Sequence, residues 1–163
     1  QTALQPGLPN LFGRAHSLGL TTSLDTNYDP SEKWIGFDEL LSSTDVFLPN
    51  TTEALSITHS EDIESAAKQL AAKSKLVAIK LGADGAILGT SDKTIFAPAI
   101  PVQVVDTIGS GDNFDAGFLY GYLNNWDLDK SLQLATACGA LSTRAVGGIT
   151  AQPTLEEALT FLT

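Results

Sequence analysis

Along the chain, residues with helical spacing alternate with short apolar runs of the kind found in buried strands. Helices are predicted over residues 9–19, 37–41, 50–58 and 62–73, with Asn50 or Thr51 as the N-cap of the third. Strands are predicted over residues 20–25, 45–49 and 75–81, and the last is apolar almost throughout, as in strands buried on both faces. This alternation predicts a parallel sheet.

The second half of the chain follows a different pattern. Short runs at residues 85–89, 94–97 and 102–105 are separated by turn residues and predict an antiparallel extension of the sheet. Helices are predicted over residues 111–124, 128–145 and 154–162. No repeat, low-complexity tract or linker interrupts this order. We therefore expect a single α/β domain over residues 1–163, with a mostly parallel sheet flanked by helices on both faces.

Composition and charge restrict the function classes. The chain has 163 residues and a formal net charge of -10, so its surface repels nucleic-acid backbones and anionic lipid heads. A site for a small anion needs only oriented N–H groups and a few cations, so nucleotides are not excluded. Cys138 is the sole cysteine, and no apolar run has the length of a membrane span. We expect a cytoplasmic protein with neither nucleic acid nor membrane as partner.

A glycine-rich junction at residues 106–117 carries the strongest candidate chemistry. A predicted strand gives way there to a helix, and the N–H groups at the helix start suit an anion. Gly109 and Gly111 lack side chains, so a phosphoryl group can approach the backbone. Asp112 lies in the first turn, where it can accept a proton from a hydroxyl that attacks phosphorus. Alternatively, the run is an ordinary turn in which Asp112 and Asp115 stabilise the helix dipole, and spacing alone does not decide.

Residues 106–117 resemble the C-terminal signature of the PfkB (ribokinase-like) family of kinases. They do not form a P-loop, because no Gly-Lys-Ser/Thr follows, and Phe114 replaces the third glycine of a dinucleotide fingerprint. The resemblance implies a ribokinase-like fold and ATP as phosphoryl donor. It also implies Asp112 as the catalytic base and the amides of Gly109, Ser110 and Gly111 as an anion hole.

Asn50 and Glu53 resemble the Asn-x-x-Glu motif of the same family. The resemblance implies that both side chains manage Mg²⁺, largely through water, close to the transferred phosphate. Residues three apart on a helix lie on one face, as a shared ion requires. Taken alone, the pair is more typical of helix capping than of an ion site.

Two further segments resemble the nucleotide site of the family. Lys80 would reach the ATP phosphates, and Gly82 and Gly85 would admit the nucleotide beside the backbone. Taken alone, Lys80 is also typical of a surface lysine before a β-turn. Residues 135–145 and the following loop with Gly147 are similar to the elements that flank the adenine ring. Many relatives bind a monovalent cation such as K⁺ through carbonyls that correspond to Asp106, Ile108 and this glycine loop.

Residues 25–34 are similar to the Asp-x-Asn-Tyr-Arg segment of sugar and sugar-acid kinases, with Asp29 in place of the arginine. The resemblance therefore implies phosphorylation of a hydroxyl on a sugar or sugar acid. The alternatives are a nucleoside or vitamin kinase of the same fold, and a non-catalytic nucleotide-binding or structural module. His16 and His59 lie outside every motif and are expected at the surface.

The resemblance covers only the C-terminal portion of a typical family member. The sequence begins with Gln1 and contains no methionine, which we interpret as part of a longer chain. The N-terminal strands, the lid, a Gly-Gly motif and an acidic residue for sugar hydroxyls are not recognisable. A sheet edge left open in this way favours a homo-oligomer or pairing with the missing half.

Overall fold

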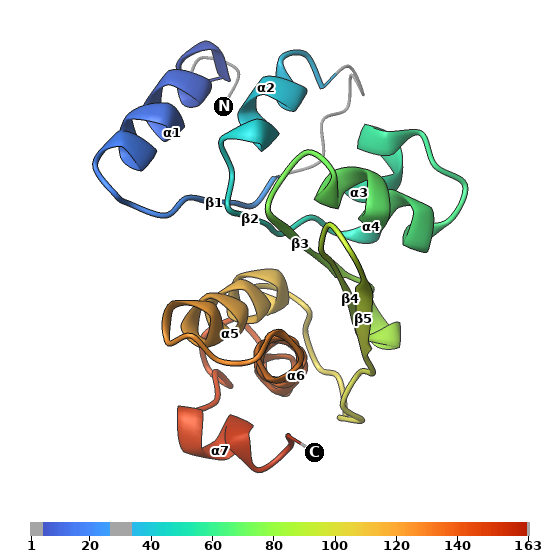
Figure 1. The fold of residues 1–163 in the computed structure, drawn as a ribbon. Coiled ribbons are helices and arrows are strands. Elements are labelled where there is room, and N and C mark those ends of the chain that lie inside the picture. The colour runs from blue at the N-terminus through green and yellow to red at the C-terminus, as the bar shows by residue number, and fades with distance from the viewer. Residues whose placement is uncertain (1–4, 27–33, 163) are drawn as a thin grey trace. The chain divides into compact units, whose positions relative to one another are not determined.

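The computed structural model describes residues 5–26 and 34–162, which divide into two compact units. The first unit comprises Gln1–Ile79 and Leu88–Thr94, and the second comprises Lys80–Ile87 and Ile95–Thr163. Five strands form one sheet in the order β1-β2-β3-β4-β5 (Figure 1). Their bounds are Ser23–Leu24, Val46–Phe47, Leu76–Lys80, Ala86–Gly89 and Thr94–Ala97.

The first three strands are parallel, as predicted. Ser23 of β1 lies opposite Val46 of β2, and Val46 lies opposite Leu76 of β3. The helices of this unit are α1 (Leu8–Ser17), α2 (Phe37–Ser42), α3 (Thr51–Thr58) and α4 (Ile63–Ala71), and a 3₁₀ turn, Gln5–Gly7, precedes α1. Every helix predicted in this half of the sequence is confirmed, with ends displaced by a few residues.

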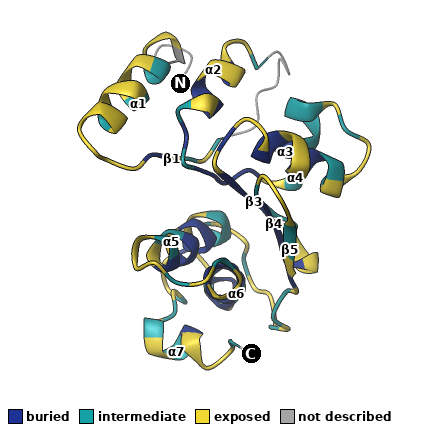
Figure 2. Cartoon of the chain, in the orientation of Figure 1, coloured by how far each residue is buried: buried dark blue, intermediate teal, exposed yellow. Residues whose placement is uncertain are grey.

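The core of the first unit lies between its strands and α2 to α4. Phe37 packs edge-on against both Trp34 and Phe47, with ring centroids 5.4 Å apart in each pair. Helix α1 has no buried residue, and its residues are either exposed or of intermediate exposure (Figure 2). The large side chains that are fully buried in this core include Leu41, Val46, Phe47, Leu48, Leu70, Ile79 and Leu88.

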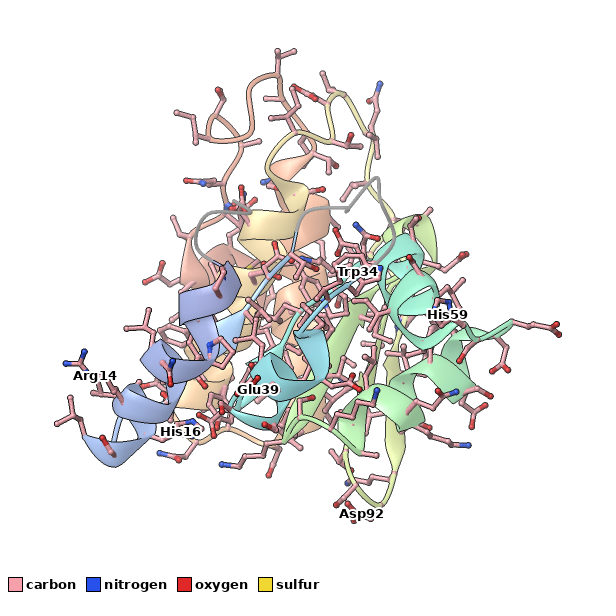
Figure 3. The ribbon with its side chains drawn as sticks, turned by 90° about the horizontal axis from the view of Figure 1, so that it is seen from above. Arg14, His16, Trp34, Glu39, His59 and Asp92 are labelled. Carbon is pink, nitrogen blue, oxygen red and sulfur yellow. The ribbon has the colours of Figure 1, made fainter. Side chains whose placement is uncertain are left out.

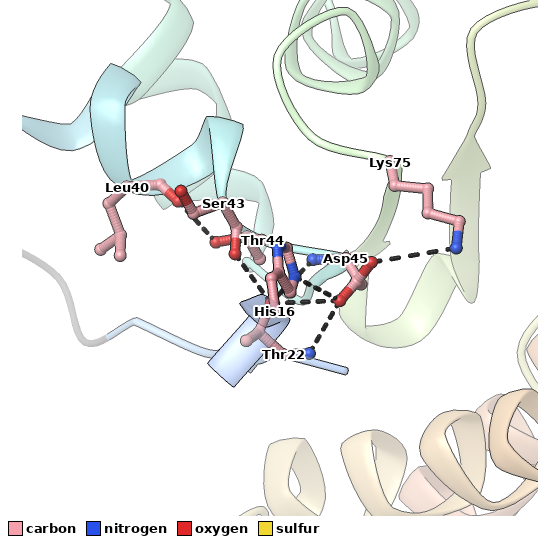
Figure 4. Close-up of polar contacts among 7 residues, drawn as sticks. All are labelled: His16, Thr22, Leu40, Ser43, Thr44, Asp45 and Lys75. Carbon is pink, nitrogen blue, oxygen red and sulfur yellow. Dashed lines mark hydrogen bonds and ion pairs between the residues drawn. The ribbon is translucent and has the colours of Figure 1, made fainter. Parts of the chain in front are cut away.

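A polar cluster joins α1 to the start of β2 (Figure 4). The Nε2 atom of His16 lies 2.8 Å from the Oδ2 atom of Asp45, and the backbone N–H of Thr22 donates to the same oxygen over 2.8 Å. Lys75 Nζ lies 3.8 Å from the other oxygen, Oδ1. Burial raises the pKa of Asp45, but the Thr22 hydrogen bond and the contacts with His16 and Lys75 outweigh it and leave the pKa lowered. His16 is exposed, as predicted, yet it holds a defined contact.

Asp45 is expected to make the stability of the protein depend on pH in the acid range. The pKa of Asp45 is lower in the folded protein than its ordinary value of 3.8. The contribution of Asp45 to folding stability is therefore complete at pH values above 3.8 and is lost as the pH falls through the pKa of the folded state. At pH 7, Asp45→Asn should lower the free energy of unfolding by about 1–3 kcal/mol, since the Thr22 amide loses a charged acceptor. Urea unfolding of both proteins at several pH values measures this difference. A difference that stays constant down to pH 2 would contradict it.

The second unit contains three helices, and the residues of a short hairpin are divided between the two units. Strands β4 and β5 are neighbours joined by residues 90–93, and so short a connection joins antiparallel strands, which confirms the predicted extension for this pair. Asp92 lies at the tip of this hairpin, and the exposed His59 ends α3 (Figure 3). The helices are α5 (Ser110–Leu123), α6 (Leu128–Ser142) and α7 (Leu155–Leu159), and a 3₁₀ turn, Gly82–Asp84, lies between β3 and β4.

The strand predicted over residues 102–105 is wrong. In the structure this segment has no strand pairing, and Val104 and Val105 are more than half exposed. The backbone N–H groups of Val105 and Asp106 both donate to the carbonyl of Thr143, over 2.8 and 3.1 Å. A carbonyl just beyond the end of α6 therefore takes the hydrogen bonds that a neighbouring strand would take. Helix α5 consequently begins after an irregular segment and not after a strand.

No helix in the described residues has the length and apolar character that a membrane span needs.

Candidate active site

The start of α5 forms the centre of the candidate site. Gly109 is the N-cap with φ +75°, and no side chain caps the helix. The Ser110 N–H donates to the Thr107 carbonyl over 3.2 Å, so this amide of the predicted anion hole takes part in a turn. The N–H groups of Gly111 and Asp112 have no acceptor within the helix, and the helix dipole places partial positive charge at this end. The local geometry therefore suits an anion.

Asp106 ties the loop before α5 to the glycine loop after α6. Its carboxylate accepts hydrogen bonds from the N–H groups of Ile108 and Gly147, over 3.0 and 2.9 Å. The bond from Gly147, followed by that from Ile108, lowers the pKa of Asp106 against a smaller effect of desolvation. The two loops whose carbonyls are predicted to hold a monovalent cation are thus tied together by the Asp106 carboxylate.

Asn113 and two glycines complete this connection. The Asn113 amide donates to the carbonyls of Gly109 and Gly148, over 2.8 and 3.3 Å. A side chain added at Gly109 would place its Cβ 3.1 Å from the Gly148 Cα, closer than ordinary contact. Glycine is therefore required for the two loops to meet.

A pocket of about 640 Å³ opens beside the start of α5, within the second unit. It brings together five of the residues predicted from the sequence, namely Lys80, Gly82, Gly85, Ser110 and Gly111. Gly109, Asp112 and Gly147 do not line it. The remaining lining residues come from four segments and are mostly small or apolar: Ala83, Ala99, Ile100, Pro101, Val102, Val104, Thr107, Phe114, Thr136, Gly139, Ala140 and Thr143.

Lys80 forms an ion pair within this unit. Its Nζ atom lies 3.1 and 3.3 Å from the two carboxylate oxygens of Asp115, and the two side chains are only 15% and 13% exposed. The same ammonium lies 3.7 Å from the position of a Cβ built on Gly111, so it stands over the first turn of α5. The interpretation of Lys80 as a plain surface lysine is therefore wrong.

Asp112 is exposed in the first turn of α5, whereas Asn113, Phe114 and Asp115 are buried. This position leaves its carboxylate accessible to a second reactant. Its role as a base stays a prediction.

Asn50 and Glu53 lie in the first unit and cap α3. The Asn50 side chain accepts from the Glu53 N–H over 3.0 Å, and the Glu53 carboxylate accepts from the Asn50 N–H over 2.9 Å. This is a complete capping box, and Glu53 is only 2% exposed. The capping interpretation is confirmed, while the role toward Mg²⁺ stays a prediction.

Sequence reasoning missed two kinds of site residue. Asp115 was considered only for the helix dipole, because nothing local in the sequence links it to Lys80, 35 positions away. The wall of residues 99–104 was missed because part of it was interpreted as a strand. The α6 wall could be found, since Thr136, Gly139, Ala140 and Thr143 follow helical spacing and lie in the segment that resembles the family's adenine flank.

These contacts do not test the expected sugar-kinase segment or the expected metal site. Residues 27–33, with Asp29 and most of the sugar-kinase segment, lie outside the described residues. Within the part of the chain that the structure describes, no group of three His, Cys, Asp or Glu side chains could hold a metal ion.

Known proteins are similar to this chain in both sequence and fold. Residues 15–155 match the model of the pfkB family of carbohydrate kinases. The chain is 33% identical over 148 residues to the ATP-dependent ribose-1-phosphate kinase of Halopiger xanaduensis. The aligned region covers 91% of this chain and 48% of that protein. It spans about half the length of the relatives that it matches.

Two solved structures superpose closely. The ribokinase of Arabidopsis thaliana, complexed with ribose and ATP, gives a TM-score of 0.82 at 28% identity, over 98% of this chain and 53% of that one. A structure named as a ribokinase II of Escherichia coli, in complex with ATP and Mg²⁺, gives 0.82 at 26% identity, over 92% and 51%.

Proposed function

Because the chain belongs to the pfkB family of carbohydrate kinases, we propose that it forms the ATP-binding part of an enzyme that phosphorylates a hydroxyl on a sugar or sugar acid. The observation that carries the proposal is the pocket beside the start of α5. Its 640 Å³ lie in the usual range for small-molecule sites. Small and apolar walls suit a planar base and a ribose, and Lys80 with the α5 N-terminus suits phosphates.

In the proposed reaction, the chain's own groups bind, orient and move a proton. The free N–H groups of the first turn of α5 stabilise charge on the transferring phosphoryl group, and Lys80 donates to a phosphate oxygen. The exposed Asp112 accepts the proton of the substrate hydroxyl as its oxygen attacks phosphorus. Lys80, Gly82 and Gly85 line the nucleotide site with Ser110 and Gly111.

Metal ions enter the proposal through the family. Mg²⁺ binds few protein carboxylates and keeps several waters, so a site without a carboxylate cluster fits an ion held mainly by nucleotide phosphates. When bound, it neutralises phosphate charge. We assign Asn50 and Glu53 to it, largely through water. K⁺ is assigned to the carbonyls of Asp106 and Ile108, in the turn that Asp106 tightens.

The proposal of a sugar substrate rests on the similarity of residues 25–34 to sugar kinases and on the relatives, among them a ribose-1-phosphate kinase. A cytoplasmic location, and pairing with the other half of the fold or with a second copy, belong to the same proposal. The pairing is supported by the match to the ribose-1-phosphate kinase, in which this chain covers only 48% of that protein.

Calorimetry with MgATP tests the nucleotide site directly. The chain is expected to bind MgATP, and Lys80→Met should weaken binding about tenfold to a hundredfold, because a charge-assisted hydrogen bond in a partly buried site is lost. Lys93→Met removes a lysine from the exposed β4–β5 turn and should leave affinity unchanged. Absence of binding at millimolar MgATP would favour a structural module over a kinase.

A further inference from the structure

The Lys80–Asp115 pair leaves the phosphate end of the pocket with little net positive charge. Among the described residues that line the pocket, Lys80 is the one with a charged side chain. Both carboxylate oxygens of Asp115 lie within 3.3 Å of its ammonium. Asp115 is 9% exposed, so solvent screens this carboxylate little. Asp112, in the first turn of α5, is exposed, so solvent screens its charge far more.

Distances decide how strongly Asp115 acts on a bound phosphate. An oxygen that accepts from Lys80 lies about 3 Å from the ammonium. Since Asp115 contacts that same ammonium, its carboxylate is at most about 6 Å from the phosphate oxygen. Coulomb energy falls as the inverse of distance, so Asp115 cancels about half or more of the attraction that Lys80 supplies. Fixing the lysine side chain is a smaller effect, because one ordered side chain costs less than a nearby buried charge.

We propose that Asp115 is a specificity-determining counter-charge, which disfavours metal-free polyphosphates and makes the pocket select nucleotides whose charge a divalent cation has already reduced. The inference rests on the proposed nucleotide site and extends it to the ionic form of the nucleotide. Metal-free ATP carries about two more negative charges than MgATP at neutral pH, so the buried carboxylate repels it more. Adenosine, without phosphate, is indifferent to Asp115.

Calorimetry on the chain with ATP in EDTA, with MgATP and with adenosine tests the proposal. Asp115→Asn keeps the shape and removes the charge, and is expected to bind metal-free ATP about tenfold tighter and MgATP about threefold tighter. Adenosine affinity should not change. Asp129→Asn is the matched control: it removes an exposed aspartate in the first turn of α6, in the same unit, and should alter none of the three affinities.

A second comparison separates repulsion from orientation of Lys80. Lys80→Met with Asp115→Asn should bind metal-free ATP more tightly than Lys80→Met alone, because the repulsion disappears even without the lysine. Replacing both partners of a buried ion pair removes both of its charges, so this comparison decides the matter if Asp115→Asn alone does not fold.

Different results overturn different claims. If the wild-type chain binds none of the three ligands, the nucleotide site itself is wrong, and the counter-charge falls with it. If the wild-type chain binds ATP but folded Asp115→Asn binds metal-free ATP equally or less tightly, only the counter-charge is wrong. Equal affinities of Lys80→Met and the double variant for metal-free ATP would also overturn the counter-charge and leave the nucleotide site intact.

Discussion

Asp112→Asn is expected to lower kcat for sugar phosphorylation by about 10²–10⁴-fold, because an amide cannot accept the proton that the attacking hydroxyl releases. The KM for ATP should change little, since Asp112 is exposed and does not line the pocket. Steady-state release of ADP, measured on the protein that carries this chain with the rest of the kinase fold, checks both numbers.

The control for this experiment is Asp129→Asn, which removes an equal charge from the exposed start of α6. It should keep the kcat of the wild-type protein. Thermal unfolding of Asp112→Asn should resemble that of the wild type, since an exposed first-turn residue contributes little to packing. Wild-type turnover in Asp112→Asn would refute the assignment of the base.

Gly85→Ala is expected to destabilise the protein by roughly 3–5 kcal/mol, because backbone strain and a steric clash act together. Gly85 has φ +104°, a region that residues with a side chain avoid. A Cβ at this position would lie 2.1 Å from the Ala97 carbonyl oxygen and 2.6 Å from the Ala99 nitrogen. Both are backbone atoms of the same unit, so the clash cannot be relieved by turning a side chain.

Gly82→Ala provides the matched control, since Gly82 also lines the pocket and also has a positive φ, +62°. No atom lies within 4 Å of a Cβ built there, so only the left-handed backbone is penalised, at about 1–2 kcal/mol. Urea and thermal unfolding of both variants separate strain from clash. Equal losses of stability in the two variants would contradict the predicted steric clash at Gly85.

Much of the fold followed from patterns that are local in the sequence. Periodicity located all seven helices of the described chain, and the apolar run over residues 75–81 predicted a buried strand, which is β3. The matches to the pfkB family and to solved ribokinases confirm the resemblance drawn from residues 106–117, and with it the ribokinase-like α/β fold. Asn50 was correctly expected as an N-cap, since capping depends on residues only three apart.

Predictions failed where a partner remote in the sequence outweighed the local preference of a segment. Residues 102–105 have the composition of a strand, but the Thr143 carbonyl, about forty positions later, accepts their hydrogen bonds. Local propensity carries no information about such a partner, and tertiary contacts override it. The interpretation of Lys80 as a surface lysine failed for the same reason, because its partner Asp115 is remote from Lys80 in the sequence but contacts it in the folded chain.

By itself, the sequence determined the order of the seven helices in the described residues, the family and the glycine-rich turn with Asp112, because each depends on neighbours within about a dozen residues. Only the tertiary structure decided which residues share the pocket, that Asp106 joins two loops, and that Lys80 forms an ion pair with Asp115. The physical reason is that burial and charge pairing depend on the distances between side chains in space, which folding sets by bringing remote segments within a few ångströms.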